Sequence, residues 1–185
     1  MAATFTWNED TGTTTGSPAK GTTRTSPATD ANWKNSGVVT DVYSSYPITA
    51  GNNSFQKVLF GVFTISTFNQ ISAGLFAHTL TAFGSNLTLK GVPACTSDGT
   101  RWLYVTPSAV ADSNLTVDMT SAIAIGSGVS VYFGATGPEA TGKASSMDGT
   151  AARYTNYLTT QLQTAVGAAA GDTAQVTLTL QYNEN

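Results

Sequence analysis

The stretch from Ser54 to Phe76, "SFQKVLFGVFTISTFNQISAGLF", is the most apolar part of the chain and constrains the fold most. Alternate side chains of an extended strand point to opposite faces of its sheet. In "FQKVLFGVFTIST" both sets of alternate residues are largely apolar, and one set includes Leu59 and Phe63 while the other includes Val58 and Phe60. This pattern is typical of a strand buried on both faces. The cover is either the protein's own core on both faces, or core on one face and a partner on the other.

The chain after this stretch repeats short strand patterns separated by turn residues. "FNQISAGLFAHTLTAF" predicts a second strand with a kink at Gly74. We expect further strands in "GVVTDVYSS" (residues 37–45), "SNLTLKG", "RWLYVT", "SNLTVDMT", "GVSVYFG" and "QVTLTLQY". Residues 154–166 fit either helical spacing or a strand face, and their threonines favour a strand. Short strands at this spacing indicate a sandwich or barrel, so we predict an all-β, antiparallel, jelly-roll-like β-sandwich.

The N-terminal region has a different composition. "ATFTW" alternates as a short strand does, but from Asn8 to Gly37 the chain is rich in Thr, Gly, Ser and Pro, with Trp33 as its one aromatic residue. Such a composition cannot build its own core. We therefore divide the chain into residues 1–37, a strand followed by an extended arm or loop, and residues 38–185, the sandwich domain. An arm could lie across a neighbouring subunit. The alternatives are a surface loop or two poorly patterned strands.

Charge is scarce in this 185-residue chain. Asp, Glu, Lys and Arg make up 10% of the residues, against about a quarter in an average soluble domain. Either neutral polar residues keep a secreted protein soluble, or partners cover much of the surface, since charges are depleted in interface cores. The net charge of −3 and the scattered basic residues argue against nucleic acid as a partner.

Sequence patterns for export and for membranes are also missing. We find no signal-peptide pattern and no clean membrane span, and we expect a protein made in the cytoplasm without a membrane partner. The single Cys95 excludes an intramolecular disulfide.

Catalytic and metal-binding patterns are absent from the sequence. The one histidine, His78, lies in an apolar strand pattern and is expected to be a core or interface residue. One Cys and one His cannot make a zinc site. Most carboxylates lie in "NED", "SDGT", "ADSN", "MDGT" and "GDT", where we expect them to stabilise turns. We therefore predict no catalytic, metal-binding or cofactor-binding residue, no cofactor and no enzymatic activity, with a carboxylate-pair glycosidase as a distant alternative.

Exposed aromatic side chains can also form a platform for carbohydrate. Trp7, Trp33 and Trp102, together with the tyrosines, are the candidates for such a platform. For each tryptophan we favour a structural role, because large aromatic residues are mostly buried.

Two segments resemble a known class of virion protein. The run "YPITAGNNSFQKVLFGVFTISTFNQIS", with its Pro47-Ile48 turn entry, its Gly51 to Ser54 turn and its strand around Gly61 and Phe63, resembles small β-sandwich proteins of tailed-bacteriophage virions. The motif Phe68-Asn69-x-Ile71-Ser72 and the acidic C-terminal "VTLTLQYNEN" share the likeness. Head decoration, or cement, proteins are the most similar members. The likeness covers about a third of the chain.

The resemblance implies a non-enzymatic, oligomeric component of the virion. We expect a decoration subunit on the outer surface of the capsid, assembled in the bacterial host cytoplasm. Its partners would be the major capsid protein and copies of itself. A tail or baseplate accessory protein is the first alternative. A carbohydrate-binding host-recognition module is the alternative from another class.

Overall fold

The computed structural model describes residues 3–11, 23–25, 32–36, 41–65, 68–78, 84–93, 115–120, 129–135, 144–169 and 177–185. Within these ranges the regular structure is almost entirely β, which confirms the predicted fold class. The elements are β1 (Phe5–Thr11), β2 (Thr23–Thr25), the 3-10 helix η1 (Tyr43–Ser45), β3 (Lys57–Phe63), β4 (Gln70–His78), β5 (Leu87–Pro93), β6 (Val117–Asp118), β7 (Val129–Val131), β8 (Phe133–Gly134), β9 (Ser146–Asp148), β10 (Arg153–Thr155), β11 (Leu158–Thr164) and β12 (Leu178–Glu184).

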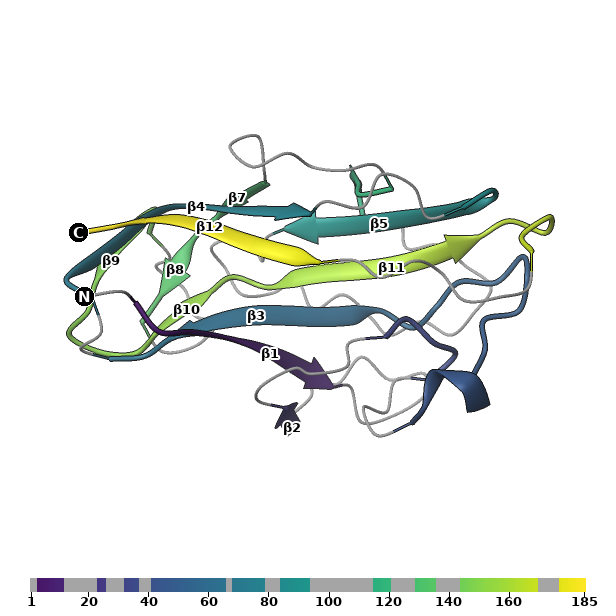
Figure 1. Cartoon of the computed structure of the whole chain (residues 1–185), viewed down its shortest axis with the longest axis horizontal. Helices are drawn as coiled ribbons and strands as arrows, with labels where there is room; N and C mark the ends of the chain where they lie inside the picture. The colour runs from purple at the N-terminus through teal and green to yellow at the C-terminus, as the bar shows by residue number, and fades with distance from the viewer. Residues whose placement is uncertain are drawn as a thin grey trace.

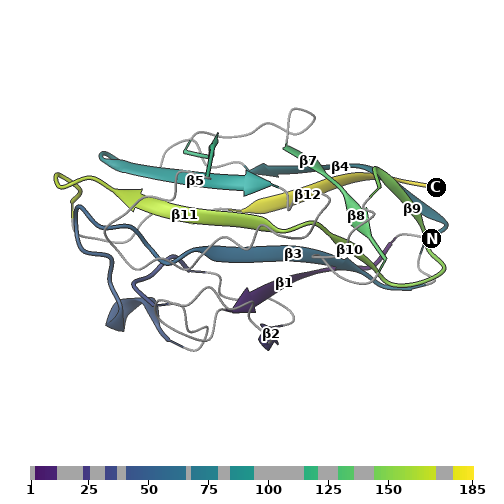
Figure 2. The same cartoon turned by 180° about the vertical axis from the view of Figure 1, so that it is seen from behind.

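The strands form two antiparallel sheets that pack face to face (Figures 1 and 2). The larger sheet has eight strands. Six of them follow the order β2-β1-β3-β11-β5-β6, while β10 pairs with β3 and β8. The smaller sheet has four strands, with β4 between β12 and β7 and with β9 also paired to β4. No helix among the described residues is long and apolar enough to span a membrane.

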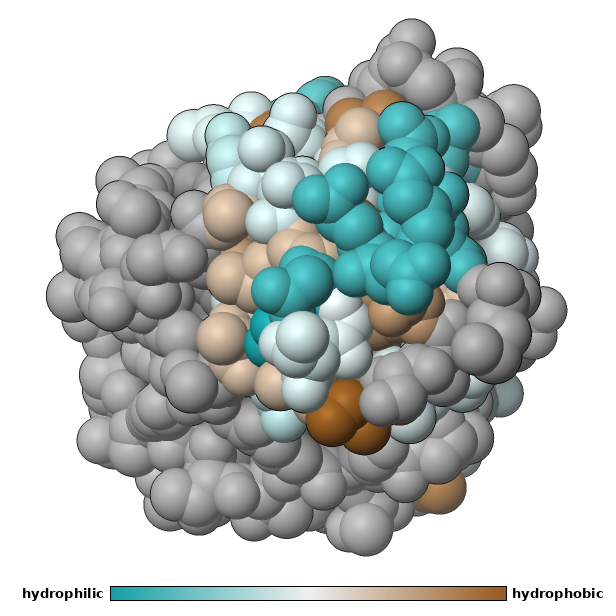
Figure 3. Space-filling view, turned by 90° about the vertical axis from the view of Figure 1, so that its left-hand side faces the viewer, coloured by the Kyte–Doolittle hydropathy of each residue, from teal (hydrophilic) through white to brown (hydrophobic). Residues whose placement is uncertain are grey.

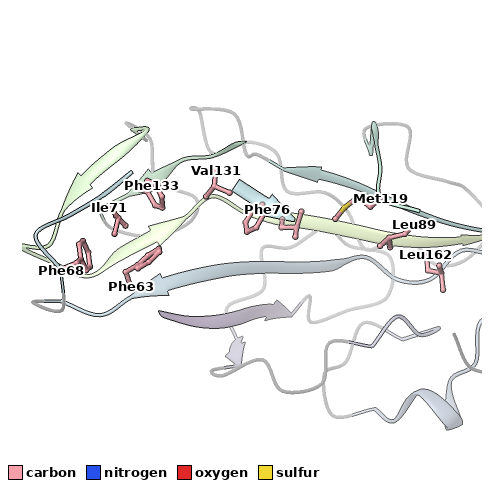
Figure 4. Packing of buried hydrophobic residues seen from close by; sticks show 10 residues of the cluster. Phe63, Phe68, Ile71, Phe76, Leu89, Met119, Val131, Phe133 and Leu162 are labelled. Carbon is pink, nitrogen blue, oxygen red and sulfur yellow. The ribbon is translucent and has the colours of Figure 1, made fainter. Parts of the chain in front are cut away.

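One hydrophobic core fills the space between the sheets (Figure 4). The larger sheet supplies Phe63 and the smaller sheet Phe76, and aromatic pairs join the two layers. Trp7 of β1 stacks on Phe76 of β4 at 5.4 Å between ring centroids, and Phe63 meets Tyr182 of β12 edge-on at 4.9 Å. The buried members of this core are Phe63, Phe68, Ile71, Phe76, Leu89, Met119, Val131, Phe133, Leu158 and Leu162.

The strand β3 is buried on both of its faces. Phe63 belongs to the core between the sheets, whereas Val58 and Phe60 point the other way and form a second buried cluster with Tyr157. Phe60 and Tyr157 meet edge-on, with ring centroids 5.7 Å apart. Since this burial is found in a single chain, β3 matches the first of the two predicted alternatives, a strand covered on both faces by its own protein.

The kink predicted at Gly74 is a β-bulge that begins one residue earlier. Ser72 pairs with Asn183 and Leu75 with Gln181, so Ala73 and Gly74 together face one residue of β12. Ala73 adopts a φ of 50°, in the left-handed region. The extra residue reverses the face of the side chains that follow it. Ile71 and Phe76, which are five residues apart, therefore both enter the core.

Within residues 154–166 the structure has strands, β10 and β11, as the threonines indicated, and the segment ends in a turn at Val166. β10 pairs with β3 through Tyr154 and Val62, and β11 pairs with the same strand through Leu158 and Leu59. Between these pairs the β10–β11 segment contains one more residue than β3 does, so it also carries a bulge. The Thr155 hydroxyl accepts a hydrogen bond from the Gly61 backbone N–H at 2.8 Å beside this bulge.

The strand predicted over residues 37–45 is wrong where the structure describes it. Residues 41–46 form a turn around η1, in which the Ser45 N–H donates to the Val42 carbonyl at 3.0 Å and the Tyr46 N–H donates to the Tyr43 carbonyl at 3.1 Å. Two consecutive serines favour turns, and Pro47 has no N–H to offer a neighbouring strand. These local preferences outweigh the apolar alternation that precedes them.

The described parts of residues 1–37 belong to the sandwich. β1 runs to Thr11, beyond the predicted "ATFTW", and pairs with β3 from Phe5↔Phe63 to Asp10↔Val58. β2 pairs with β1, which matches the alternative of poorly patterned strands. Trp33 packs against the core, and the Lys34 carbonyl accepts a hydrogen bond from the Phe55 N–H at 3.0 Å. The predicted strand "RWLYVT" and Cys95 lie outside the described residues.

We expect Gly61→Ala to destabilise the protein. A Cβ at this position would lie 2.1 Å from Cε2 of Phe5, the residue next to Trp7 and Phe63 in the core. Overpacking of this kind costs about 1–3 kcal/mol of unfolding free energy, measurable by urea denaturation. Phe5→Leu removes the ring, so the double variant should lose less than the sum of the two single losses. Additive losses would contradict the proposed clash.

Candidate functional site

The one histidine lies in the protein interior. His78 ends β4 opposite Leu178, and its side chain is buried. Neither ring nitrogen has a hydrogen-bond partner in the described part of the chain. Burial lowers the pKa of His78 below the usual 6.5, because desolvation disfavours the imidazolium, while the Met119 backbone has a smaller, opposite effect. An enclosed, neutral imidazole supports the prediction of a core residue.

An ion pair lies inside the sandwich. Lys57 Nζ is 2.7 Å from Glu9 Oε1, and the two side chains are only 2% and 4% exposed. Glu9 lies opposite Leu59 in the β1–β3 ladder, so its side chain shares a face with Lys57. The "NED" segment was predicted to be a turn, and this is wrong: it lies within β1, where Glu9 neutralises a lysine 48 residues away in sequence. Because almost none of either side chain is exposed to solvent, the ion pair serves the fold.

The turn prediction is correct for the aspartate of "MDGT". Asp148 Oδ1 accepts hydrogen bonds from the Thr150 N–H at 3.0 Å and from Arg153 Nη2 at 2.6 Å. The Thr150 and Arg153 hydrogen bonds lower its pKa to about 2. Asp118 has the same arrangement with Thr120, whose N–H donates to Oδ1 at 2.9 Å, and with Lys90 at 3.1 Å. These carboxylates are therefore occupied by their turns.

The other acidic residues form no metal-binding cluster in the part of the chain that the structure describes. Among the described residues, no group of three or more His, Cys, Asp or Glu side chains could hold a metal ion. Three further aspartates of the predicted turns lie outside the described residues, namely Asp98, Asp112 and Asp172. Asp30 and Glu139 also lie outside them.

The tryptophans in the described residues are structural. Trp7 and Trp33 both pack against the core. The Trp33 indole N–H donates a hydrogen bond to the Thr160 hydroxyl at 3.1 Å. Neither ring is therefore an open platform for a sugar, and Trp102 lies outside the described residues.

Both chain termini lie at one end of the sandwich, on the left of Figure 1, where a hydrophilic patch lies beside less polar and apolar residues (Figure 3). Its exposed residues include Asn69, Gln70, Asn183 and Asn185. The dark blue coil of η1 lies at the other end in both cartoon views.

A turn at the η1 end presents large apolar side chains to solvent. Val42 is 55% exposed, Tyr43 47% and Tyr46 41%. Sequence reasoning did not single out this turn, because the same residues also fit a strand pattern. A usable signal was the pair of tyrosines flanking two serines just before Pro47. Among the described residues, we take this turn as the candidate functional site.

We expect the ion pair to show strong energetic coupling. Glu9→Leu or Lys57→Met alone leaves one buried charge unpaired, which typically costs about 3–5 kcal/mol of stability. The double variant Glu9→Leu/Lys57→Met removes both charges and should be far more stable than the sum of the single losses implies. Urea denaturation of the four proteins measures the coupling. A double variant that simply adds the two losses would show that the charges do not interact.

We expect His78 to make the protein sensitive to acid. Its folded pKa lies below the unfolded value of about 6.5, so the unfolded chain binds more protons as the pH falls through 6.5. The stability due to neutral His78 is therefore complete above that pH and is lost below it. Between pH 7.5 and 5.5 the wild type should therefore lose more unfolding free energy than His78→Leu does. Equal losses in chemical denaturation would refute a role for His78.

Comparison with protein-family models, curated proteins and solved structures finds no match to this chain.

Proposed function

We propose that this protein is a structural component of a tailed-bacteriophage virion, a decoration or cement subunit that binds the outer surface of the capsid. The observation that carries the proposal is the exposed turn of Val42, Tyr43 and Tyr46 on a folded sandwich. Aromatic side chains are enriched at protein interfaces and often dominate their binding energy. A protein that displays them on an ordered turn has a surface suited to a partner.

The chemistry of the described residues supports binding rather than catalysis. Lys57, Glu9 and His78 are buried, and the turn aspartates Asp118 and Asp148 accept hydrogen bonds from their own neighbours. The exposed turn carries no charged side chain between Val42 and Ala50. Its candidate chemistry is therefore contact with a neutral surface.

The segments that resemble decoration proteins lie side by side in space. The central resembling run contains β3 and the first three residues of β4, and the C-terminal resembling segment contains β12, whose Asn183 and Glu184 pair with Ser72 and Ile71 of that run. The likeness therefore concerns one contiguous part of the sandwich, although its two pieces are about a hundred residues apart in the chain. This supports the proposal at the level of architecture.

Decoration would strengthen a shell through many copies of a modest contact. A subunit that touches neighbouring capsomers, or a second copy of itself, makes its later contacts within an already assembled complex. The partners in this proposal are the major capsid protein and further copies of this chain. A carbohydrate-binding role receives less support, because Trp7 and Trp33 are occupied in the core.

The proposal predicts binding to capsids that lack the protein. Shells of the phage that encodes this chain, assembled without it, are mixed with the purified protein and sedimented. We expect saturable co-sedimentation, a higher melting temperature of the shells, and self-association of the free protein in analytical ultracentrifugation. A protein that stays monomeric and remains in the supernatant would contradict the proposal. Electron microscopy of particles distinguishes the head from the tail as its location.

A further inference from the structure

The side chain of His78 faces the apolar core at the end of β4. His78 lies opposite Leu178 in the β4–β12 ladder, and directly opposed residues share one face of a sheet. Leu178 packs against the core, so the imidazole points the same way. The residue is 1% exposed, and neither ring nitrogen has a hydrogen-bond partner among the described residues. A protonated ring in this place would be costly, because burying a charge without a partner is unfavourable.

The described elements around His78 offer it no free anion. Tyr182 and Glu184 of β12 and Asp148 of β9 are the titratable side chains of the strands that pair with β4. Burial keeps Tyr182 neutral by raising its pKa above 10. Glu184 pairs with Ile71, about 23 Å from His78 along an extended strand.

The remaining charged groups near this core are already paired. Asp148 lies beyond Ile71 and accepts a hydrogen bond from the Thr150 N–H. Beside Met119, whose backbone is close to the imidazole, Asp118 is paired with Lys90. In the larger sheet, Lys57 and Glu9 neutralise each other. Protonated His78 therefore requires contact with water.

The strand β12 is anchored most firmly at its C-terminal end. There the Asn185 N–H donates to the Gln70 carbonyl at 3.0 Å, and the Gln70 N–H donates to the Asn185 carbonyl at 3.1 Å. The Glu184 carboxylate accepts a hydrogen bond from the Ala3 N–H at 2.7 Å. The ring of Tyr182 packs edge-on against a core phenylalanine of the larger sheet. Both termini lie at this end of the molecule (Figure 1).

The β-bulge at Ala73 separates that anchored end from the start of β12. Residues 178–180 pair with residues 76–78 on one side of the bulge, and residues 183–184 pair with residues 71–72 on the other. A bulge interrupts the regular ladder, so the two parts of β12 can separate from β4 independently. Among the described strands, β12 pairs with β4 alone.

We propose that His78 is a pH-sensitive switch for the start of β12. The neutral imidazole keeps residues 178–180 paired with β4, and protonation releases them so that the ring reaches water. The part of β12 beyond the bulge stays in place. This inference goes beyond the proposed capsid-binding function and does not depend on it. It also goes beyond the acid sensitivity of the whole fold, because it identifies which part of the sandwich opens first.

The direction of the switch follows from the two states of the ring. Burial lowers the pKa of closed-state His78 below 6.5, whereas a hydrated ring has the ordinary value. Lowering the pH through 6.5 therefore favours the open state, and raising it restores the closed one. Hydrogen bonds from Thr120 and Thr150 hold the pKa values of Asp118 and Asp148 at about 2, so these carboxylates do not titrate between pH 7.5 and 5.5.

Hydrogen–deuterium exchange of the full chain at pH 7.5, 6.5 and 5.5 tests the switch. Protection is corrected for the effect of pH on intrinsic exchange. We expect a reversible loss of protection at residues 178–180 and 76–78 in acid, with little change at residues 183–185 or in β3. His78→Leu keeps an apolar side chain at this position and cannot titrate, so its protection should not depend on pH in this range.

The ring itself gives a second readout, because His78 is the only histidine of the chain. Its carbon-bound protons in an NMR titration report protonation directly. We expect the ring to titrate at the same pH at which residues 178–180 lose protection. Leu178→Ala covers the ring less well, so it should shift this pH upward, toward 6.5. These measurements on the wild type and Leu178→Ala decide the matter even where His78→Leu does not fold.

Three results would overturn the switch. The first is an equal loss of protection in β3, β4 and all of β12, which would mean that the whole fold opens together. The second is a ring that titrates while residues 178–180 stay protected, since water would then reach His78 without any opening. The third is the same local loss of protection in His78→Leu, which would assign the effect to another group.

Discussion

The burial of β3 on both faces is the constraint on which the rest of the structure depends. One face packs into the core through Phe63, and the other packs through Phe60 against Tyr157. Each fully buried aromatic side chain contributes about 1.5–3 kcal/mol relative to exposure. β3 pairs with β1 along one edge and with β10 and β11 along the other. The strand therefore fixes its neighbours along both edges and requires residues packed against both of its faces.

The buried ion pair follows from the same constraint. Lys57 begins β3 on the face that includes Phe63, where a lone ammonium would be costly. Glu9 supplies its counter-charge from β1. A slip of the β1–β3 register by one residue would turn Glu9 to the opposite face and leave both charges unpaired. The pair therefore favours one alignment of the two strands, a role that apolar residues alone would perform less selectively.

Strand positions were predictable where alternation or continuous apolar character is strong, as in β3, β4, β5 and β12. Features that depend on residues distant in the sequence could not be predicted. Glu9 looks like part of a polar turn until Lys57 is placed beside it, and the end of β1 carries no apolar signal. Gly74 suggested a kink, but the strained residue of the bulge is Ala73. The exposure of Tyr43 and Tyr46 was hidden, because the contacts from Lys34 that shape their turn are not encoded in the local pattern.

The absence of charged side chains between Val42 and Ala50 has a kinetic consequence if this turn makes the contact in the proposed capsid-binding function. Without charge complementarity there is little electrostatic steering, so each encounter should proceed at the ordinary rate for proteins, about 10⁵–10⁷ M⁻¹s⁻¹. Specificity would then come from shape, and the turn has a defined shape, because Lys34 donates to the Asp41 carbonyl and the Asn35 N–H donates to the Tyr46 carbonyl. In the proposed assembly, affinity would come from repetition, because a shell has many equivalent binding sites and each bound subunit favours the binding of its neighbours. The scarcity of charge in the chain is consistent with such an assembly, in which order and number replace long-range attraction.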